Sequence, residues 1–264
     1  MSLLEKGTEQ DDYVLFIHKI KTATGIDLAQ YKEAQMKRRL TTLRLRHGYD
    51  SFAAFFEGME QNKALFLDFL DRMTINVSEF WRNRNRWEVL QNTLLPSLTS
   101  HLPLKVWSAA CSTGEEPYTL AMILDTAGLL SSSKIIATDI DDGALARAQQ
   151  GTYLERSLKE VPEQVVKKYF IPEGLHYKID PKLAAAVHFS KQNLLMDSFE
   201  DGFDLIVCRN VMIYFTEEAK HVLYQKFANA LRPGGILFVG STEQIFSPGE
   251  YGLEGAETFF YRKK

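Results

Sequence analysis

Residues Leu104–Tyr118 read LKVWSAACSTGEEPY, an apolar run that leads into small residues, Gly114 and the start of a helix. A second apolar run, Lys134–Asp142 (KIIATDIDD), ends in acidic residues, and Asp139 follows Gly114 by 25 positions. A strand, a tight turn, a helix and a carboxylate at the end of the next strand are typical of the nucleoside-binding half of a doubly wound α/β sheet. We therefore predict a ligand that carries a ribose.

The residues of this turn argue against a dinucleotide ligand. The pattern G-x-G-x-x-G is absent, and Gly114 is the turn's only glycine. A pyrophosphate needs bare backbone N–H groups at a helix N-terminus, whereas Glu115 and Glu116 would repel it. A cationic ligand would be attracted instead. S-adenosylmethionine meets these demands, because it has a ribose, an adenine, a sulfonium and an ammonium group, and no phosphate.

Composition places the chain among ordinary globular proteins. It has 264 residues, 45% of them hydrophobic and 25% charged, with a net charge of −3, which leaves room for one large or two modest domains. The first residues, MSLLEKGTEQDD, lack a basic segment followed by an apolar core, and no later run of about 20 uncharged apolar residues occurs. We expect a cytoplasmic protein without direct membrane insertion.

The cysteines and histidines offer no familiar reactive arrangement. Cys111 and Cys208 are too few for a disulfide framework or a cysteine-rich zinc site. They are either neighbouring reduced thiols at strand ends or two small buried hydrophobic residues. The sequence has no H-E-x-x-H motif, no Ser-His-Asp arrangement and no paired-metal spacing. We therefore expect no metal.

The hydrophobic pattern divides the chain into a helical part and an α/β part. Residues 1–84 are predicted to form a small all-α domain, because apolar residues recur every three or four positions from Asp12 onward. Residues 85–103 are predicted to be a connecting helix, ending near Pro96, and a linker. In residues 104–264, the runs LKVWSAA, KIIATDI, VHFSKQN, FDLIVCR and GGILFVG are predicted strands with helical patterns between most of them. This alternation indicates a parallel sheet.

Two segments depart from simple alternation. Residues from about 152 to 187 contain three prolines, a short helical pattern and an alternating LHYKID, and they are predicted to form an inserted β-subdomain. The final GAETFFYRKK is predicted to be one antiparallel strand, since little room precedes it for a crossover helix. The expected fold is a Rossmann-like methyltransferase sheet with an antiparallel last strand and a small inserted β-subdomain, preceded by the all-α domain.

Four separated strings resemble the chemotaxis receptor glutamate methyltransferases, the CheR family. They are TINVSEFWR, SAACSTGEEPYTLAM, ATDIDDGALARAQQGTY and CRNVMIYF, in the family's order, and the resemblance covers nearly the whole chain. It implies an S-adenosylmethionine-dependent enzyme that methylates glutamate side chains on the cytoplasmic helices of chemoreceptors. The spent product would be S-adenosylhomocysteine.

The resemblance also implies the cofactor contacts, residue by residue. They are Asn76, Ser78, Arg82, Ala109, Gly114, Glu116, Asp139, Ile140, Asn193, Leu194, Arg209 and Asn210. Ser78 stands where members often carry Thr, and Trp81 where they often carry Phe. Because the hydroxyl and the aromatic ring are both kept, we expect binding to survive.

The acidic residues of these motifs have competing interpretations. Asp139 is predicted to bind the ribose, because Asp141 and Asp142 are better placed to cap the next helix. One of Glu115 and Glu116 is expected only to complement the helix dipole. Glu116 is assigned to the cofactor on the resemblance alone.

The expected methyl transfer requires no general base. The acceptor carboxylate has a usual pKa of about 4.3 and is already ionised at neutral pH. Arg82, Arg209 and Tyr214 are predicted to surround it, because a guanidinium can bind both oxygens. An arginine that holds the attacking oxygen would slow the reaction, so its expected role is to orient the other oxygen or to close over the cofactor. The alternatives are arginines paired with acids at helix ends and a half-buried core tyrosine.

Residues Lys32–His47 (KEAQMKRRLTTLRLRH) contain six Lys or Arg and one Glu. Met36, Leu40 and Leu43 form an apolar stripe at helical spacing. Four cations flank that stripe and are predicted to face outward, toward the acidic helices of a receptor; they are Lys37, Arg39, Arg44 and Arg46. A solvated charged face and a nucleic-acid surface are the alternatives.

Three functions therefore compete. The leading one is a protein-glutamate O-methyltransferase, which we expect to act as a monomer without nucleic acid. The second is an RNA methyltransferase that docks through the basic helix. The third is a non-catalytic module that senses S-adenosylmethionine.

Overall fold

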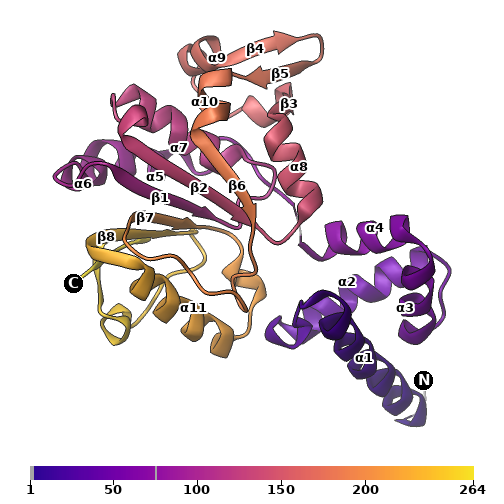
Figure 1. Ribbon diagram of the computed structural model, residues 1–264. Coiled ribbons are helices and arrows are strands. Elements are labelled where there is room, and N and C mark those ends of the chain that lie inside the picture. The colour runs from indigo at the N-terminus through magenta and orange to yellow at the C-terminus, as the bar shows by residue number, and fades with distance from the viewer. Residues whose placement is uncertain (1–2, 75) are drawn as a thin grey trace. The chain divides into compact units, whose positions relative to one another are not determined.

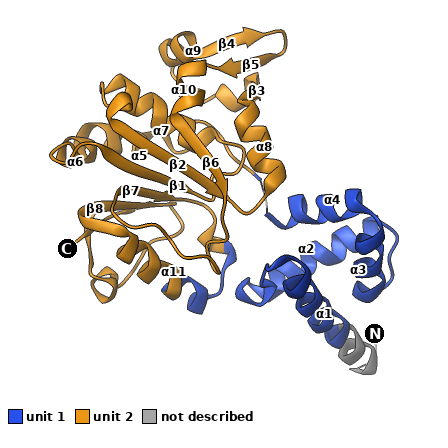
Figure 2. Ribbon diagram, viewed as in Figure 1, with its two compact units in different colours: residues 1–76, 214–221 blue, residues 77–213, 222–264 orange. Residues whose placement is uncertain are grey.

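The computed structural model describes residues 3–74 and 76–264, which form two compact units. The helical unit contains residues 1–76 and 214–221, and the sheet unit contains residues 77–213 and 222–264 (Figure 2). Among the residues described, no helix is long and apolar enough to cross a membrane.

Four α-helices of the N-terminal segment make up most of the helical unit. They are α1 (Leu3–Thr24), α2 (Glu33–Arg46), α3 (Phe52–Gln61) and α4 (Lys63–Thr74), with a 3₁₀ turn at Leu28–Gln30. Side chains cap the 3₁₀ turn and α3, because Asp27 accepts a hydrogen bond from Ala29 N and Ser51 accepts one from Ala54 N. The prediction of an all-α N-terminal domain is confirmed.

Aromatic rings fill the core of the helical unit. The Phe16 ring of α1 lies 5.0 Å from the Phe52 ring and 6.0 Å from the Phe69 ring, measured between centroids. All three side chains are fully buried. Burial of such rings supplies most of the free energy that holds short helices together.

A seven-stranded sheet forms the centre of the other unit, in the order β6-β2-β1-β7-β8-β10-β9. Figure 1 labels β6, β2, β1, β7 and β8 of this sheet. Its strands are β1 (Leu104–Ala109), β2 (Ser133–Asp139), β6 (Val187–Lys191), β7 (Phe203–Cys208), β8 (Leu231–Val239), β9 (Leu253–Glu257) and β10 (Phe260–Lys263). The first five are parallel, whereas β10 is antiparallel to β8. The predicted parallel sheet with an antiparallel last strand is confirmed.

The C-terminal segment differs from the prediction in one respect. GAETFFYRKK was expected to be one strand, but it contributes to two, because β9 and β10 form an antiparallel hairpin. Phe259 turns the chain between them with a positive φ of 72°. Charged and small residues in the β9 half are compatible with its position at the sheet edge.

Helices connect most of the strands along the chain. They are α5 (Arg84–Val89), α6 (Leu95–Leu98), α7 (Glu115–Thr126), α8 (Asp142–Gln150), α9 (Glu163–Tyr169), α10 (Pro181–Ala186) and α11 (Glu217–Ala230). A π-helical turn at Leu90–Leu94 joins α5 to α6, so the connecting helix continues past Pro96 to Leu98. A proline is tolerated there because it occupies the first turn of α6.

Alternating side chains of the strands supply a core on each face. Val106, Ile135 and Leu205 belong to the cluster that includes α7. Trp107 points to the other face, where its ring centroid lies 5.6 Å from that of Phe227 in α11. Figure 1 shows α7 and α11 on opposite sides of the sheet accordingly.

The insert between α8 and β6 is a three-stranded antiparallel sheet. Its order is β3-β5-β4, with β3 at Thr152–Leu154, β4 at Phe170–Glu173 and β5 at His176–Ile179. Helix α9 corresponds to the short helical pattern, and β5 to the alternating one. The predicted small β-subdomain is confirmed.

Candidate active site

The turn after β1 follows an unusual backbone path. Ala110, Ser112 and Gly114 have positive φ values of 59°, 49° and 95°. A Cβ atom on Gly114 would lie 2.9 Å from both Ala148 Cβ and the Tyr153 hydroxyl, so only glycine fits. Backbone hydrogen bonds tie the turn to β2, since Cys111 N donates to Thr138 O at 2.9 Å. The turn is therefore fixed at the carboxyl ends of β1 and β2, where open α/β sheets bind ligands.

Asp139 ends β2 and is 6% exposed. One carboxylate oxygen accepts a hydrogen bond from Ser112 N at 2.8 Å, and the other accepts one from Asp141 N at 3.0 Å. Asp141, not Asp139, caps α8 by accepting from Gly143 N and Ala144 N. Because a carboxylate has about four acceptor positions, Asp139 retains capacity for ribose hydroxyls.

Glu115 and Glu116 begin α7 and differ in their partners. Glu115 is 4% exposed and accepts a hydrogen bond from the Thr113 hydroxyl at 2.6 Å. Glu116 accepts one from the Ser108 hydroxyl at 2.8 Å, and its side chain is 14% exposed. Burial raises the pKa of Glu116 to about 7, although the Arg209 guanidinium opposes that rise. Burial also raises the pKa of Glu115 and of Asp139.

Arg209 follows β7 and is held between two aromatic rings. Its guanidinium carbon lies 5.1 Å from the Trp87 ring centroid and 4.7 Å from that of Phe238. Nη2 donates to Arg82 O at 2.8 Å, and Nη1 lies 3.7 Å from a Glu116 oxygen. Because Glu116 lies in the first turn of α7, Arg209 also matches the alternative interpretation of an arginine beside an acidic residue at a helix end.

The segment Ser78–Arg82 borders the same turn. The Ser78 hydroxyl hydrogen-bonds to the Glu115 carboxylate, and Trp81 N donates to the Thr119 hydroxyl at 3.4 Å. The Arg82 side chain is half-buried and donates from Nη1 to Val77 O at 3.2 Å. These contacts place Ser78 and Arg82 in the same region as Glu115 and Arg209.

The loops after β6 and β7 supply the remaining predicted cofactor residues of the sheet unit. Gln192 N donates to Asp139 O at 2.9 Å, which brings Asn193 and Leu194 to the end of β2. Asn210 directly follows Arg209 and has a positive φ of 62°. The predicted residues Ser78, Arg82, Ala109, Gly114, Glu116, Asp139, Ile140, Asn193, Leu194, Arg209 and Asn210 all belong to the sheet unit.

Two predicted site residues belong to the helical unit. The Asn76 amide donates to the Thr74 hydroxyl at 3.1 Å. Tyr214 is half-buried, its backbone oxygen accepts from Lys32 N at 2.8 Å, and its ring centroid lies 5.8 Å from the Arg39 guanidinium carbon. Their assignment to the cofactor and to the reacting carboxylate stays a prediction.

Helix α2 presents its cations differently from the expectation. Arg44 was predicted to face outward, but it is 6% exposed, donates to Tyr49 O at 3.0 Å and lies over the Phe52 ring. The prediction was wrong because Arg44 lies one helical turn after Leu40 and shares its buried face. The other three cations are less buried: Lys37 donates to Gln10 at 2.7 Å, Arg39 to Arg72 O at 3.4 Å, and Arg46 pairs with Asp68.

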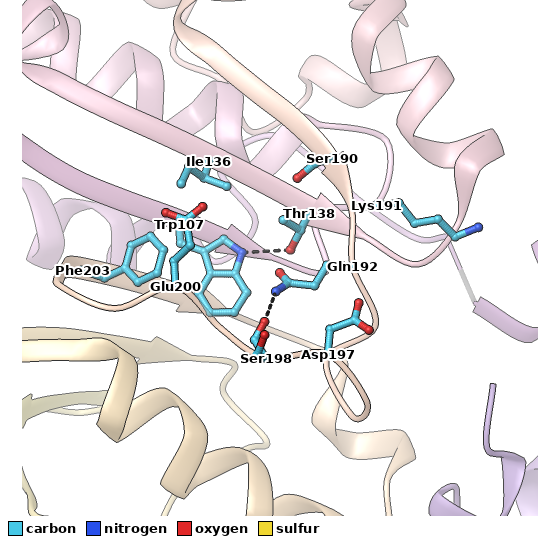
Figure 3. Close-up of a pocket in the computed structure, with 10 residues that line it drawn as sticks. All are labelled: Trp107, Ile136, Thr138, Ser190, Lys191, Gln192, Asp197, Ser198, Glu200 and Phe203. Atoms are coloured by element: carbon cyan, nitrogen blue, oxygen red, sulfur yellow. Dashed lines mark hydrogen bonds between the residues drawn. The ribbon is translucent and has the colours of Figure 1, made fainter. Parts of the chain in front are cut away.

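A separate cavity of about 240 Å³ lies beside β2 and β6 (Figure 3). Trp107, Ile136 and Phe203 contribute to its walls, and the Trp107 indole N–H donates to the Thr138 hydroxyl at 2.9 Å. None of the predicted cofactor residues lines it. Within the described part of the chain, no three His, Cys, Asp or Glu side chains could together hold a metal ion.

Both parts of the chain match known protein domains. Residues 76–259 match the CheR methyltransferase S-adenosylmethionine-binding domain, and residues 11–74 match the CheR methyltransferase all-alpha domain. The chain belongs to the CheR methyltransferase family. The resemblance read from the four motifs is confirmed.

Curated relatives are similar in sequence to this chain over almost its whole length. A chemotaxis protein methyltransferase of Listeria monocytogenes is 46% identical over 256 residues, which cover 96% of this chain and 98% of the relative. Chemotaxis protein methyltransferase 2 of Pseudomonas aeruginosa is 34% identical, with 89% and 87% covered. The Salmonella typhimurium chemotaxis protein methyltransferase is also 34% identical, with 90% and 86% covered. The chain is accordingly an S-adenosylmethionine-dependent methyltransferase of the chemotaxis type.

The residues of the site fit this methyl donor. Three carboxylates lie around one turn, those of Glu115, Glu116 and Asp139. Burial disfavours their charged forms, which costs free energy and raises the pKa of each. A ligand with positive charge and no phosphate would offset that cost, whereas a phosphate would increase it. Two residues without a predicted role fix the neighbouring loops: Tyr153 donates to Thr113 O at 2.8 Å, and Glu243 accepts from Asn210 N at 2.6 Å. Neither has a sequence signal, because both contacts join segments far apart in the chain.

Proposed function

We propose that this methyltransferase transfers the methyl group of S-adenosylmethionine to glutamate carboxylates on the cytoplasmic helices of chemoreceptors. The proposal rests mainly on the match of both parts of the chain to the two CheR domains. The products would be glutamyl methyl esters and S-adenosylhomocysteine. When bound, the donor supplies a methyl group on a sulfonium, so that its C–S bond breaks as the carboxylate oxygen forms the new C–O bond.

Glu116 and Asp139 would hold the donor. We assign Asp139 to the ribose hydroxyls and Glu116 to a cationic group of the donor. Glu116 is suited to that role, because burial disfavours its charged form more strongly than Arg209, 3.7 Å away, and the Ser108 hydroxyl favour it. A second cation beside it would stabilise the ionised form.

Arg82 and Arg209 would act in different ways on the acceptor. Arg209 is 7% exposed, and its Nη2 already donates to Arg82 O and to the Asn83 side chain. We therefore assign Arg209 to holding the Arg82 segment and to fixing a positive charge near the site. Arg82 is half-buried, so its guanidinium can orient the acceptor oxygen that does not attack. Tyr214 remains our proposed third polar group around that carboxylate.

The acceptor itself explains why the site would need no general base. A glutamate carboxylate is ionised at neutral pH, so no proton has to leave it before attack. The chain's contribution is then to align the two reacting groups and to exclude water. Such alignment supplies several kcal/mol of barrier reduction in comparable reactions.

Receptor docking would use the exposed part of helix α2. Arg38 is exposed and 48% of the Arg46 side chain is accessible, while Lys37 and Arg39 are half-buried. We exclude Arg44, since its guanidinium lies in the core of the helical unit. An acidic helical bundle is the partner that such a surface favours.

The test is to incubate the protein with methyl-labelled S-adenosylmethionine and either receptor membranes or total RNA. We expect label in the receptors that alkali releases as methanol, because methyl esters are hydrolysed by base. Receptors whose methylated glutamates are replaced by alanine are the matched control and should stay unlabelled. Base-stable label in RNA, or donor binding without transfer to either substrate, would refute the proposal.

A further inference from the structure

We propose that Glu243 is a positioning residue, which holds the loop Arg209–Ile213 in the shape that the cofactor site requires. Glu243 lies in the segment after β8 and is 4% exposed. Its role would be exerted through Arg209 and Asn210, and in that assignment the inference rests on the proposed cofactor site.

Both oxygens of Glu243 are used by backbone N–H groups. Oε2 accepts from Asn210 N at 2.6 Å and from Gly240 N at 2.8 Å. Oε1 accepts from Met212 N at 2.7 Å and from Ile213 N at 3.3 Å. One carboxylate thus joins two loops that follow neighbouring parallel strands.

The loop after β7 needs such a partner. Successive N–H groups that point inward form a concave anion site, and buried N–H groups without an acceptor are costly. Asn210 also has a positive φ of 62°, a conformation that asparagine tolerates better than most residues but at a higher cost than glycine. The Glu243 carboxylate therefore compensates both for the N–H groups and for the backbone conformation of Asn210.

Gly240 permits the close approach. A Cβ atom on Gly240 would lie 2.3 Å from Glu243 Oε2 and 2.9 Å from Asn210 N. Any larger residue would push the carboxylate away from the loop. Gly240 thus leaves the space in which the Glu243 carboxylate binds the loop.

Glu243 is linked to the cofactor site through Asn210 and then Arg209. Asn210 is next to Arg209, whose guanidinium contacts Arg82 O and faces Glu116. The charge of Glu243 also favours the ionised Arg209 and disfavours a second negative charge on Glu116. A change at Glu243 should therefore alter cofactor affinity through Asn210 and Arg209.

The test compares Glu243→Gln with Asp204→Asn by calorimetric titration of S-adenosylhomocysteine. Asp204 is the matched control, because it is 3% exposed, accepts from Lys105 N at 2.7 Å and pairs with Arg232 near the amino end of β7. Both variants should lose thermal stability. Only Glu243→Gln should raise the dissociation constant, by about tenfold.

A second variant covers the case in which Glu243→Gln fails to fold. Gly240→Ala keeps the carboxylate and displaces it, so we expect the same weakening of binding. Wild-type affinity in a folded Glu243→Gln or Gly240→Ala variant, or equal weakening in Asp204→Asn, would overturn the inference. Failure of the wild-type protein to bind S-adenosylhomocysteine would instead refute the cofactor assignment. Neither result depends on which acceptor is methylated.

Discussion

The affinity for S-adenosylhomocysteine should increase from pH 6 to pH 7, because Glu116 must lose a proton to bind the ligand's ammonium group. Burial raises the pKa of Glu116 to about 7 in the ligand-free protein, with Arg209 opposing the rise. If only the ionised form binds, the dissociation constant is larger by about elevenfold at pH 6 and about twofold at pH 7. The expected gain is therefore about fivefold, or about 1 kcal/mol.

The stability of the ligand-free protein should change in the opposite direction. A carboxyl group whose pKa is raised on folding binds more protons in the folded state, so its contribution to the free energy of unfolding falls as pH rises from about 4.5 to about 7. As pH rises, the ligand should bind more tightly while the free energy of unfolding of the ligand-free protein falls. This combination would distinguish titration of Glu116 from a general effect of pH on the fold. The ligand's own α-amino group has a usual pKa near 8 and stays largely protonated over this range.

Calorimetric titrations in buffers of different ionisation enthalpy would measure both the affinity and the protons released. We expect release of about 0.9 protons per ligand at pH 6. Glu116→Gln is the control, in which binding should be weak and nearly independent of pH. Equal affinity of the wild-type protein at pH 6 and pH 7, with no proton release, would refute the assignment of Glu116 to a cationic group of the ligand.

Three further predictions follow from named contacts. Asp139→Ala should weaken binding of S-adenosylmethionine by about 1.5–3 kcal/mol, and unchanged affinity in calorimetry would remove Asp139 from the ribose site. Arg38→Glu should slow receptor methylation several-fold and leave cofactor affinity at the wild-type value. Arg44→Leu, which loses the hydrogen bond to Tyr49 O, should instead lower the free energy of unfolding by about 1–3 kcal/mol in denaturant titrations. Similar behaviour of the two variants in both assays would contradict this distinction. Asp125→Asn should lower the free energy of unfolding by about 1 kcal/mol at neutral pH after allowance for solvent screening, because hydrogen bonds from Lys182 and Tyr169 lower the pKa of Asp125 to about 2. The difference in unfolding free energy from wild type should shrink below about pH 4. A difference that is constant with pH would show that ionisation of Asp125 is not its source.

The sequence by itself determined the sheet and the position of the turn. Continuous apolar runs such as LKVWSAA and KIIATDI, separated by helical patterns, are typical of buried parallel strands. A lone glycine followed by two acidic residues argues against a phosphate-bearing ligand at the turn. Local capping was also readable, because Asp141 accepts hydrogen bonds from residues two and three positions ahead. These features depend on neighbours along the chain, so no tertiary information was needed.

Only the tertiary structure decided which charges are exposed and which loops are held together. The sequence predicts Arg44 to be a surface cation, whereas it is buried beside Phe52, because helical spacing does not say which face of a helix other elements cover. The contact between Glu243 and Asn210 joins residues 33 positions apart and has no local signal. The rise in the pKa of Glu116 likewise depends on burial and on Arg209, both of which arise when distant segments pack. Local pattern fixes the elements, whereas the electrostatics of the site depend on which elements exclude water from it.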